Sequence, residues 1–404
     1  MTNDLNQKLE APFSLSSHEF LTNPYLIYDK LRSKHPIFKE HSFKYPGWYV
    51  TGYEEAVAVL KDTRFKNRIP LTQTSKKYEH LKNIQNDMML FKNQHDHKRL
   101  RMMVSKVFTP NVVERYRPFI EETVNDLLNQ VQNKKSMDVV SDFAFPLASL
   151  IIAKILGVPA EERYQFREWT VSLIQTIDFT RSRKTLANGN HTTKMLIAYF
   201  KQLINKRKHI PQNDLISMLI LEEEQGEKLT DEELLATCIL LVIAGHETTV
   251  NLISNSVLAL LNHPEQLMKL KENPSIIKMA VEEFLRYESP TQMTARIASE
   301  DTEMNGITIK KSEQVYILLG AANRDPKKFI DPNVLDITRN PNPHLAFGYG
   351  IHFCLGSSLA RLETQIAIVT LLQRMDNLQL VTPDLHWRNL IGFRSLQELQ
   401  ITFN

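Results

Sequence analysis

Cysteine is scarce in this sequence, with 2 in 404 residues. So few cysteines exclude a disulfide framework and are typical of a protein from a reducing compartment. Cys238 and Cys354 lie far apart in the chain, so no C-x-x-C pair is present to hold zinc or an iron-sulfur cluster. Any chemistry of sulfur here must therefore come from a single thiol.

Strong net charge, linkers and leader segments are missing too. The net charge is only +3, which gives no sign of nucleic-acid binding. No Gly/Ser-rich linker, low-complexity run or internal repeat divides the chain, so we expect one domain over residues 1–404. The first 20 residues lack an apolar signal or anchor and carry the charged residues Asp4, Lys8, Glu10 and Glu19. We expect a cytoplasmic monomer that does not bind a membrane.

An uninterrupted apolar run of membrane-spanning length is also absent. Residues 234–261 are largely apolar, but polar side chains at 246–249, 251 and 255 break the centre, and a span needs about 18 apolar residues in a row. A zincin helix is excluded because Val250 stands where H-E-x-x-H needs histidine. A buried helix with a polar break remains. There Gly245 lets a ligand approach, and Glu247 and Thr248 disturb the hydrogen-bond ladder.

The remaining pattern predicts a mainly α protein with a small β region, an α+β fold. Apolar residues at helical spacing predict helices over 54–61, 111–132, 145–156, 160–177, 193–208, 231–261, 264–272 and 275–287. Short β-like runs occur at 37–38, 48–51 and 314–319. Asn305-Gly306 between two β-like triplets predicts a tight hairpin.

What the sequence does have is a glycine-rich turn that carries Cys354 to the start of an amphipathic helix. The segment 347–356 contains Gly348, Gly350 and Gly356, and apolar residues then recur in steps of four and three. Near a helix N-terminus the macrodipole and free N-H groups stabilise a thiolate, so we expect Cys354 to ionise readily and bind a soft or borderline metal. Glycine permits positive φ angles and close approach to a flat ligand.

Other interpretations of this segment fit less well. A phosphate-binding G-x-G-x-x-G fails because Phe353 stands where the third glycine is needed, and residues 340–343 are proline-rich where a strand is required. An inert buried cysteine would not need the glycines or His352 around it. Thiolate ligation of haem iron is the interpretation that the residues favour.

The segment 347–356 resembles the haem-binding signature of the cytochrome P-450 monooxygenases. The resemblance extends to residues 244–249 and 283–286, to Arg339, and to His97 with Arg101. It implies the P-450 fold, a triangular helical prism with haem b between a long central helix and the helix after the cysteine loop. It also implies an enzyme that uses O2, with Cys354 as axial ligand of the iron, where an anionic sulfur favours O-O cleavage.

The resemblance assigns further residues to the haem site. Phe347, Gly348, Ala244 and Gly245 would pack around the haem. Its propionates need cationic or donor partners, for which the family pattern indicates His97, Arg101, Arg296 and His352. Glu283 and Arg286 would form a buried pair joined by Arg339, with a structural role and no part in proton transfer.

The same resemblance assigns proton delivery to Thr248 and Glu247. Reductive activation of O2 consumes two protons, which must enter a pocket otherwise closed to solvent, and an alcohol with a carboxylate can deliver them. The alternative for Thr248 is a mid-helix hydroxyl that bonds back to its own helix. A haem-based sensor or electron carrier would not require this pair of residues.

The sequence indicates the source of electrons and the substrate less directly than it indicates the haem site. No nicotinamide or flavin motif is present, so electrons from NAD(P)H must arrive through a ferredoxin or flavodoxin with its reductase, docking on a cationic face near Lys98, Arg99 and Lys106. A small apolar substrate would need a hydrophobic pocket, although methionine and aromatic residues more often belong to the hydrophobic core. The candidates for its lining are Met88, Met89, Leu90, Ile174, Ile177, Phe179, Met293 and Phe393.

Three strings, 45–53, 172–181 and 287–296, resemble the biotin-operon branch of this family. That branch cleaves long fatty acyl chains on acyl carrier protein to a pimeloyl product, by successive hydroxylations and C-C scission. Basic residues at 181, 183 and 184, or at 206–208, are candidates for meeting the acidic carrier; the alternative is a solvated cationic face. A hydroxylase of macrolides, statin-like compounds or other secondary metabolites stays open.

Overall fold

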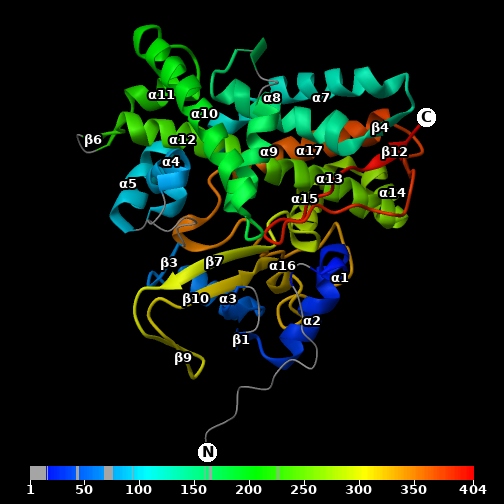
Figure 1. Cartoon of the computed structure of the whole chain (residues 1–404). Helices are drawn as coiled ribbons and strands as arrows, with labels where there is room; N and C mark the ends of the chain where they lie inside the picture. The colour runs from blue at the N-terminus through cyan, green and yellow to red at the C-terminus, as the bar shows by residue number, and fades with distance from the viewer. Residues whose placement is uncertain are drawn as a thin grey trace, which may run out of the picture.

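The structure is a computed structural model that describes residues 15, 17–41, 45–67, 76–92, 94–159, 161–162, 166–224 and 227–404. Most of the molecule is helical, and a smaller β region lies to one side, beneath the helices in Figure 1. The α+β prediction is confirmed. The helices are α1 His18–Thr22, α2 Pro24–Lys34, α3 Tyr53–Lys61, α4 Glu79–Asp87, α5 Gln94–Ser105, α6 Pro110–Glu114, α7 Arg117–Gln132, α8 Phe145–Ile155, α9 Phe166–Ile177, α10 Arg183–His209, α11 Leu215–Leu221, α12 Asp231–Ala244, α13 Glu247–Asn262, α14 Pro264–Glu272, α15 Ile277–Tyr287, α16 Leu319–Ala322 and α17 Ser357–Arg374.

Several helix boundaries differ from those expected. The helix predicted over 111–132 is divided into α6 and α7, because Pro118 lacks an N-H and is tolerated only in the first turn of a helix. The helix predicted over 193–208 begins ten residues earlier, at Arg183, where Ser182 and Thr185 form a capping box. Part of the segment predicted over 160–177 lies outside the described residues, and α9 begins at Phe166.

The main sheet has the strand order β1-β2-β10-β7-β3. Its strands are β1 Ile37–Glu40, β2 Gly47–Val50, β3 Phe65–Asn67, β7 Met293–Ala298 and β10 Gln314–Leu318. A second sheet joins β4 Ser136–Asp138 to β11 Gln379–Leu380 and β12 Gln400–Thr402, and β5 Glu223–Glu224 pairs with β6 Glu227–Lys228. The predicted hairpin is confirmed: Asn305 and Gly306 both have positive φ between β8 Thr302–Met304 and β9 Ile307–Ile309.

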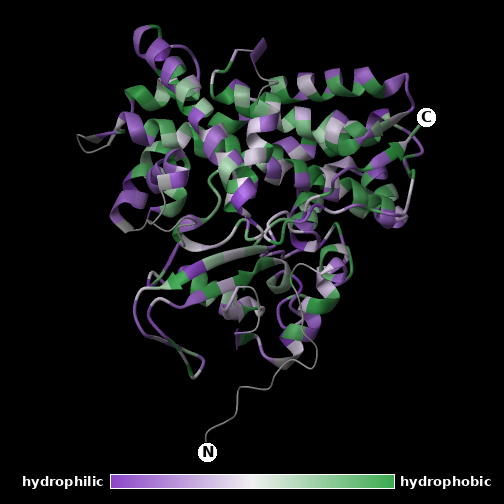
Figure 2. Cartoon of the chain, in the orientation of Figure 1, coloured by the Kyte–Doolittle hydropathy of each residue, from purple (hydrophilic) through white to green (hydrophobic). Residues whose placement is uncertain are grey.

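The largest hydrophobic cluster lies among the helices, with α12, α13 and α17 contributing to it. Outer helices such as α7 bury one face, at residues Ile120, Val124, Leu127 and Val131, and Figure 2 shows hydrophobic and hydrophilic residues alternating along it. One helical segment of the described residues, Asp231–Asn262, is long and apolar enough to cross a membrane. Because 83% of its most apolar window is buried, its apolar surface is used in packing, as predicted for the central helix.

Candidate functional site

The cysteine loop is held by its own backbone. The N-H of Gly348 donates to Leu345 O at 2.8 Å, and the N-H of Cys354 donates to Phe347 O at 2.9 Å. Gly348 and Gly350 have φ of +73° and +74°, and a Cβ on Gly350 would lie 2.7 Å from Leu60 O. Only glycine fits these two positions without strain. The loop therefore folds back on itself and presents Cys354 from a half-buried position.

The electrostatics of Cys354 differ from the expectation. Burial raises the pKa of the thiol, and the Gly356 N-H and the charges of Arg101 and Arg361 offset this only in part. Helix α17 starts at Ser357, so the sulfur precedes the helix and does not lie within its first turn. The prediction that this thiol ionises readily by itself is therefore wrong. A metal cation bound to the sulfur removes the proton outright, so ligation remains compatible with burial.

The central helix opens at one place. Residues 234–243 and 249–260 are buried, whereas Ala244 is exposed and Gly245 and Thr248 are partly exposed. Ala244 and Thr248 are four apart and share one face of the helix. Helix α13 packs against α17, the helix that follows the cysteine loop, so the face that carries Ala244 and Thr248 belongs to an element that neighbours the cysteine segment.

The helical ladder is interrupted at the opening, where α12 ends at Ala244 and α13 starts at Glu247. The Thr248 hydroxyl donates to Ala244 O at 2.9 Å. It therefore bonds back to its own helix, as the alternative interpretation of this residue predicts. The hydroxyl oxygen keeps its acceptor capacity. His246 fills the interruption: its Nε2 lies 2.6 Å from Ser149 Oγ and its Nδ1 2.9 Å from Thr170 Oγ1.

Glu247 connects the central helix to the C-terminal segment. Its carboxylate accepts a hydrogen bond from Ser395 Oγ at 2.8 Å and forms an ion pair with Arg388. Glu247 is 2% exposed, whereas the Arg388 side chain is 21% exposed, so the pair extends from the interior to solvent. Sequence reasoning missed Arg388 and Ser395, because they lie 141 and 148 residues further along the chain.

Four basic side chains predicted to serve the propionates are brought near one another. The His97 and His352 ring centroids are 4.2 Å apart, and Arg101 Nη2 donates to Phe353 O at 2.6 Å. Arg296 is a buried residue of β7, where its Nη1 donates to Ala295 O at 3.0 Å. Asn67, which the sequence did not single out, lies 3.2 Å from His352 Nδ1 and pairs with Arg296 in the sheet.

This basic cluster is short of negative charge. Among the described residues no carboxylate pairs with His97, Arg101, Arg296 or His352. Burial, helped by the neighbouring cations, lowers the pKa of His97 to about 4 and of His352 to about 3, and burial alone lowers the pKa of Arg296 to about 10. A buried group of basic side chains without a carboxylate partner favours the binding of an anion. Two carboxylates of a bound group, such as haem propionates, would supply that charge.

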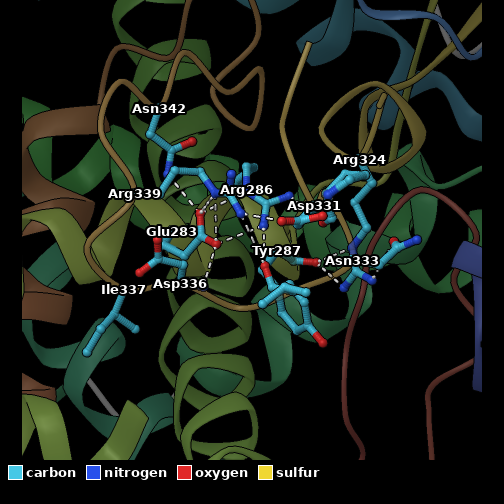
Figure 3. A network of polar contacts seen from close by, with 12 residues as sticks. Glu283, Arg286, Tyr287, Arg324, Asp331, Asn333, Asp336, Ile337, Arg339 and Asn342 are labelled. Carbon is cyan, nitrogen blue, oxygen red and sulfur yellow. Dashed lines mark hydrogen bonds and ion pairs between the residues drawn. The ribbon is translucent and has the colours of Figure 1, made fainter. Parts of the chain in front are cut away.

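A buried ionic network joins α15 to the segment that contains Arg339 and Asn342, as Figure 3 shows. Arg286 and Glu283 on α15 are both 0% exposed, with Nε and Nη2 each 2.8 Å from a carboxylate oxygen. Arg339 Nε lies 3.2 Å from both Glu283 oxygens, and Asn342 Nδ2 and the Asp336 N-H also donate to this carboxylate. The segment that leads to Cys354 is therefore attached to α15.

The residues proposed for a substrate pocket come from more than one hydrophobic cluster. Met88 and Ile174 are buried in the main helical cluster, whereas Phe179 and Met293 belong to the cluster around α1 and α2. Leu90 is exposed, and Phe393 forms a β-bridge with Thr291. Three of them approach one another, since a Cβ on Gly392 would lie 3.3 Å from the Phe179 ring and the Met293 N-H donates to Gly392 O at 3.5 Å, next to Phe393. One pocket lined by all the proposed residues stays a prediction.

The proposed cationic patches contain fewer free surface charges than expected. Arg207 is buried, paired with Asp214 and donates to Gly157 O, so it does not belong to the surface patch predicted at 206–208. Lys206 and Lys208 are exposed. Three further basic residues form ion pairs with acids on neighbouring elements: Lys208 with Asp231, Arg99 with Glu233, and Lys106 with Glu222. Lys98, Arg183 and Lys184 remain exposed.

Comparison with known proteins agrees with this geometry. The family model for cytochrome P-450 matches residues 9–384. The chain is 64% identical over 390 residues to the biotin biosynthesis cytochrome P-450 of Bacillus subtilis, covering 96% of this chain and 98% of that protein. It is 39% identical over 399 residues to the polyketide biosynthesis cytochrome P-450 PksS of the same organism, covering 96% and 97%.

A solved structure is similar across nearly the whole chain. The crystal structure of the P-450 enzyme BioI in complex with acyl carrier protein carrying hexadec-9Z-enoic acid matches with a TM-score of 0.93 and 64% identity. It covers 97% of this chain and 100% of that one. With the half-buried cysteine, the opened central helix and the unpaired basic cluster, these matches show that the chain belongs to the cytochrome P-450 family of haem-thiolate monooxygenases.

Proposed function

We propose that this enzyme oxidises long fatty acyl chains presented by acyl carrier protein, and that it cleaves them to supply a pimeloyl precursor of biotin. The observation that carries this proposal is the 64% identity, over 96% of the chain, to a biotin biosynthesis relative. A solved relative with the same identity holds a hexadecenoyl chain on acyl carrier protein. Successive hydroxylation of adjacent carbons, followed by C-C scission, accounts for such a product.

The residues of the site have separate tasks in this proposal. Haem b, when bound, supplies activation of O2 and insertion of one oxygen atom into a C-H bond. Cys354 would hold its iron, and Phe347, Gly348, Ala244 and Gly245 would leave room for the ring. The basic side chains of His97, Arg101, Arg296 and His352 would bind its propionates. Each charge-assisted bond is worth about 1.5–3 kcal/mol.

Proton delivery falls to Glu247 and Thr248 in this proposal. Thr248 Oγ1 lies at the opening of the central helix and can accept a hydrogen bond there while it donates to Ala244 O. The carboxylate of the preceding residue, Glu247, is buried and is joined to the partly exposed Arg388. Reorientation of this carboxylate would carry protons from the solvent side to the Thr248 hydroxyl.

We also propose the setting of the reaction. Electrons from NAD(P)H would arrive singly from a ferredoxin or flavodoxin with its reductase. A cytoplasmic location is supported by the scarcity of cysteine. One domain over residues 1–404 is supported by the sheet that joins β4 near residue 137 to β12 near residue 401.

Optical titration of the haem-loaded protein tests the substrate. Long-chain acyl groups on acyl carrier protein are expected to shift the Soret band as water leaves the iron, and free fatty acids are expected to do so more weakly. Macrocyclic and statin-like compounds form the third arm, because a polyketide biosynthesis relative is 39% identical. A response to macrocycles alone would reject the acyl-chain proposal in favour of a secondary-metabolite hydroxylase.

A further inference from the structure

A second charged network lies beside the one in Figure 3 and was not singled out from the sequence. Glu282, the residue before Glu283, accepts two hydrogen bonds from Arg361 of α17, Nε at 2.6 Å and Nη2 at 2.8 Å. Its Oε2 also lies 3.1 Å from His344 Nε2. Adjacent residues on α15 point in different directions, about 100° apart around the helix, so each carboxylate holds a different part of the cysteine loop.

The hydrogen bonds of His344 show which ring nitrogen accepts and which donates. The N-H of Ala346 donates to His344 Nδ1 at 3.2 Å, so this nitrogen is an acceptor and the proton of the neutral ring sits on Nε2. His344 therefore donates to Glu282 through its Nε2-H. Burial of Glu282 raises its pKa, but the donors Arg361 and His344 outweigh this and lower the pKa to about 2. Arg361 and Glu282 thus form an ion pair to which His344 adds one hydrogen bond.

Arg361 connects this unit to the cysteine. Its guanidinium lies over the Phe347 ring, 4.5 Å from the centroid, and Phe347 O accepts the N-H of Cys354 at 2.9 Å. A fixed cation stacked on the residue that holds the cysteine backbone is placed to influence electron density on the sulfur.

We propose that Arg361, balanced by Glu282 and oriented by His344, sets the reduction potential of the haem by partly neutralising the charge of the Cys354 thiolate. These are positioning residues, since none touches the reacting atoms. Reduction adds one negative charge at the iron, so a nearby cation favours the reduced state and a nearby anion disfavours it. The proposal rests on haem-thiolate ligation alone and is independent of the substrate.

The sign of this effect supplies the test. In R361Q the Glu282 anion is left, so the potential should fall; in E282Q the Arg361 cation is left, so the potential should rise. Each shift should change the ratio of reduced to oxidised haem at a fixed potential by at least about threefold, or about 28 mV at 59 mV per tenfold change. The double variant should return close to the parent, and R361K, which keeps the charge, should stay near it.

The measurement is a spectroelectrochemical titration of the substrate-free, haem-loaded proteins. R374Q, at the far end of the same helix, removes a cation whose hydrogen-bond partners among the described residues are all neutral, and it should leave the potential unchanged. Shifts of the same sign in R361Q and E282Q, or no shift in either, would overturn the proposal in favour of a packing role. A parent protein whose reduced carbonyl adduct lacks the red-shifted Soret band would instead show that thiolate ligation itself had failed.

Discussion

The substitution Glu283→Gln probes the network that attaches the cysteine loop to the helical core. Glu283 receives two bonds from Arg286, two from Arg339 and one each from Asn342 Nδ2 and the Asp336 N-H. Glutamine has nearly the same shape, so no cavity is created. It removes the negative charge, however, and turns an N-H donor group toward guanidinium donors.

The size of the effect follows from the burial of the pair. Arg286 and Glu283 are both 0% exposed, so in E283Q the Arg286 cation stays buried without its counter-charge. Breaking a buried ion pair in this way costs about 3–5 kcal/mol. Since a folded domain is stable by about 5–15 kcal/mol, this loss is a large fraction of the total. The carbonyl oxygens of Asn323, Pro332 and Val334 still accept from Arg286 and offset only part of it.

Urea unfolding of the haem-loaded protein, followed by far-UV circular dichroism and by the Soret band, measures this loss. We expect the midpoint to fall and haem to be released at a lower urea concentration than in the parent. The matched control is D301N, which breaks the exposed pair of Asp301 with Lys310 and should leave the midpoint unchanged. A loss of less than about 1 kcal/mol in E283Q would refute the argument, because it would mean that the Arg286 charge is not isolated from solvent.

The remaining predictions concern the cysteine, the relay and acid stability. C354S should abolish the red-shifted Soret band of the reduced carbonyl adduct; retention of that band would exclude the sulfur as ligand. T248A should lower product per electron pair by about tenfold or more, with hydrogen peroxide formed in its place, because the hydroxyl that carries protons is gone. An unchanged product yield would point to a sensor, a carrier or another relay. Glu282 has a folded-state pKa of about 2, below its ordinary 4.5, so it stabilises the fold above about pH 4.5 and this contribution is lost as the pH falls toward 2. E282Q should therefore flatten the acid side of a urea-midpoint profile, and an identical acid slope in parent and variant would contradict the pairing.

Features that depend on neighbours in the chain could be predicted well. The positive φ of Gly348 and Gly350, the Asn305-Gly306 hairpin and the interruption of the central helix near Gly245 all follow from local backbone chemistry. The attachment of Arg339 to the Glu283-Arg286 pair agreed with the family pattern. The predicted ends of two helices were wrong, at the cap Ser182 and at Pro118. Both predictions followed the spacing of hydrophobic residues, which does not show where a cap or a proline starts a helix.

Long-range partners and desolvation could not be predicted. The pairing of Glu247 with Arg388 and the Arg361-Glu282-His344 unit join residues from separate elements, and nothing in the local sequence identifies them. Arg207 looked like a surface cation and is buried against Asp214. The Cys354 thiol looked easy to ionise and has a raised pKa, because burial acts against the charged form more strongly than its donors act for it.

The amino-acid sequence by itself determined which atoms are available: one thiol on a glycine turn, an acid and an alcohol in a helix, and basic residues at fixed spacings. Those properties depend on side-chain type and on a few neighbouring φ and ψ angles. Only the tertiary structure decided which charges lose their water and which partner each one meets. Both outcomes depend on segments distant in the chain packing together, since hydration and Coulomb energy are functions of position in space.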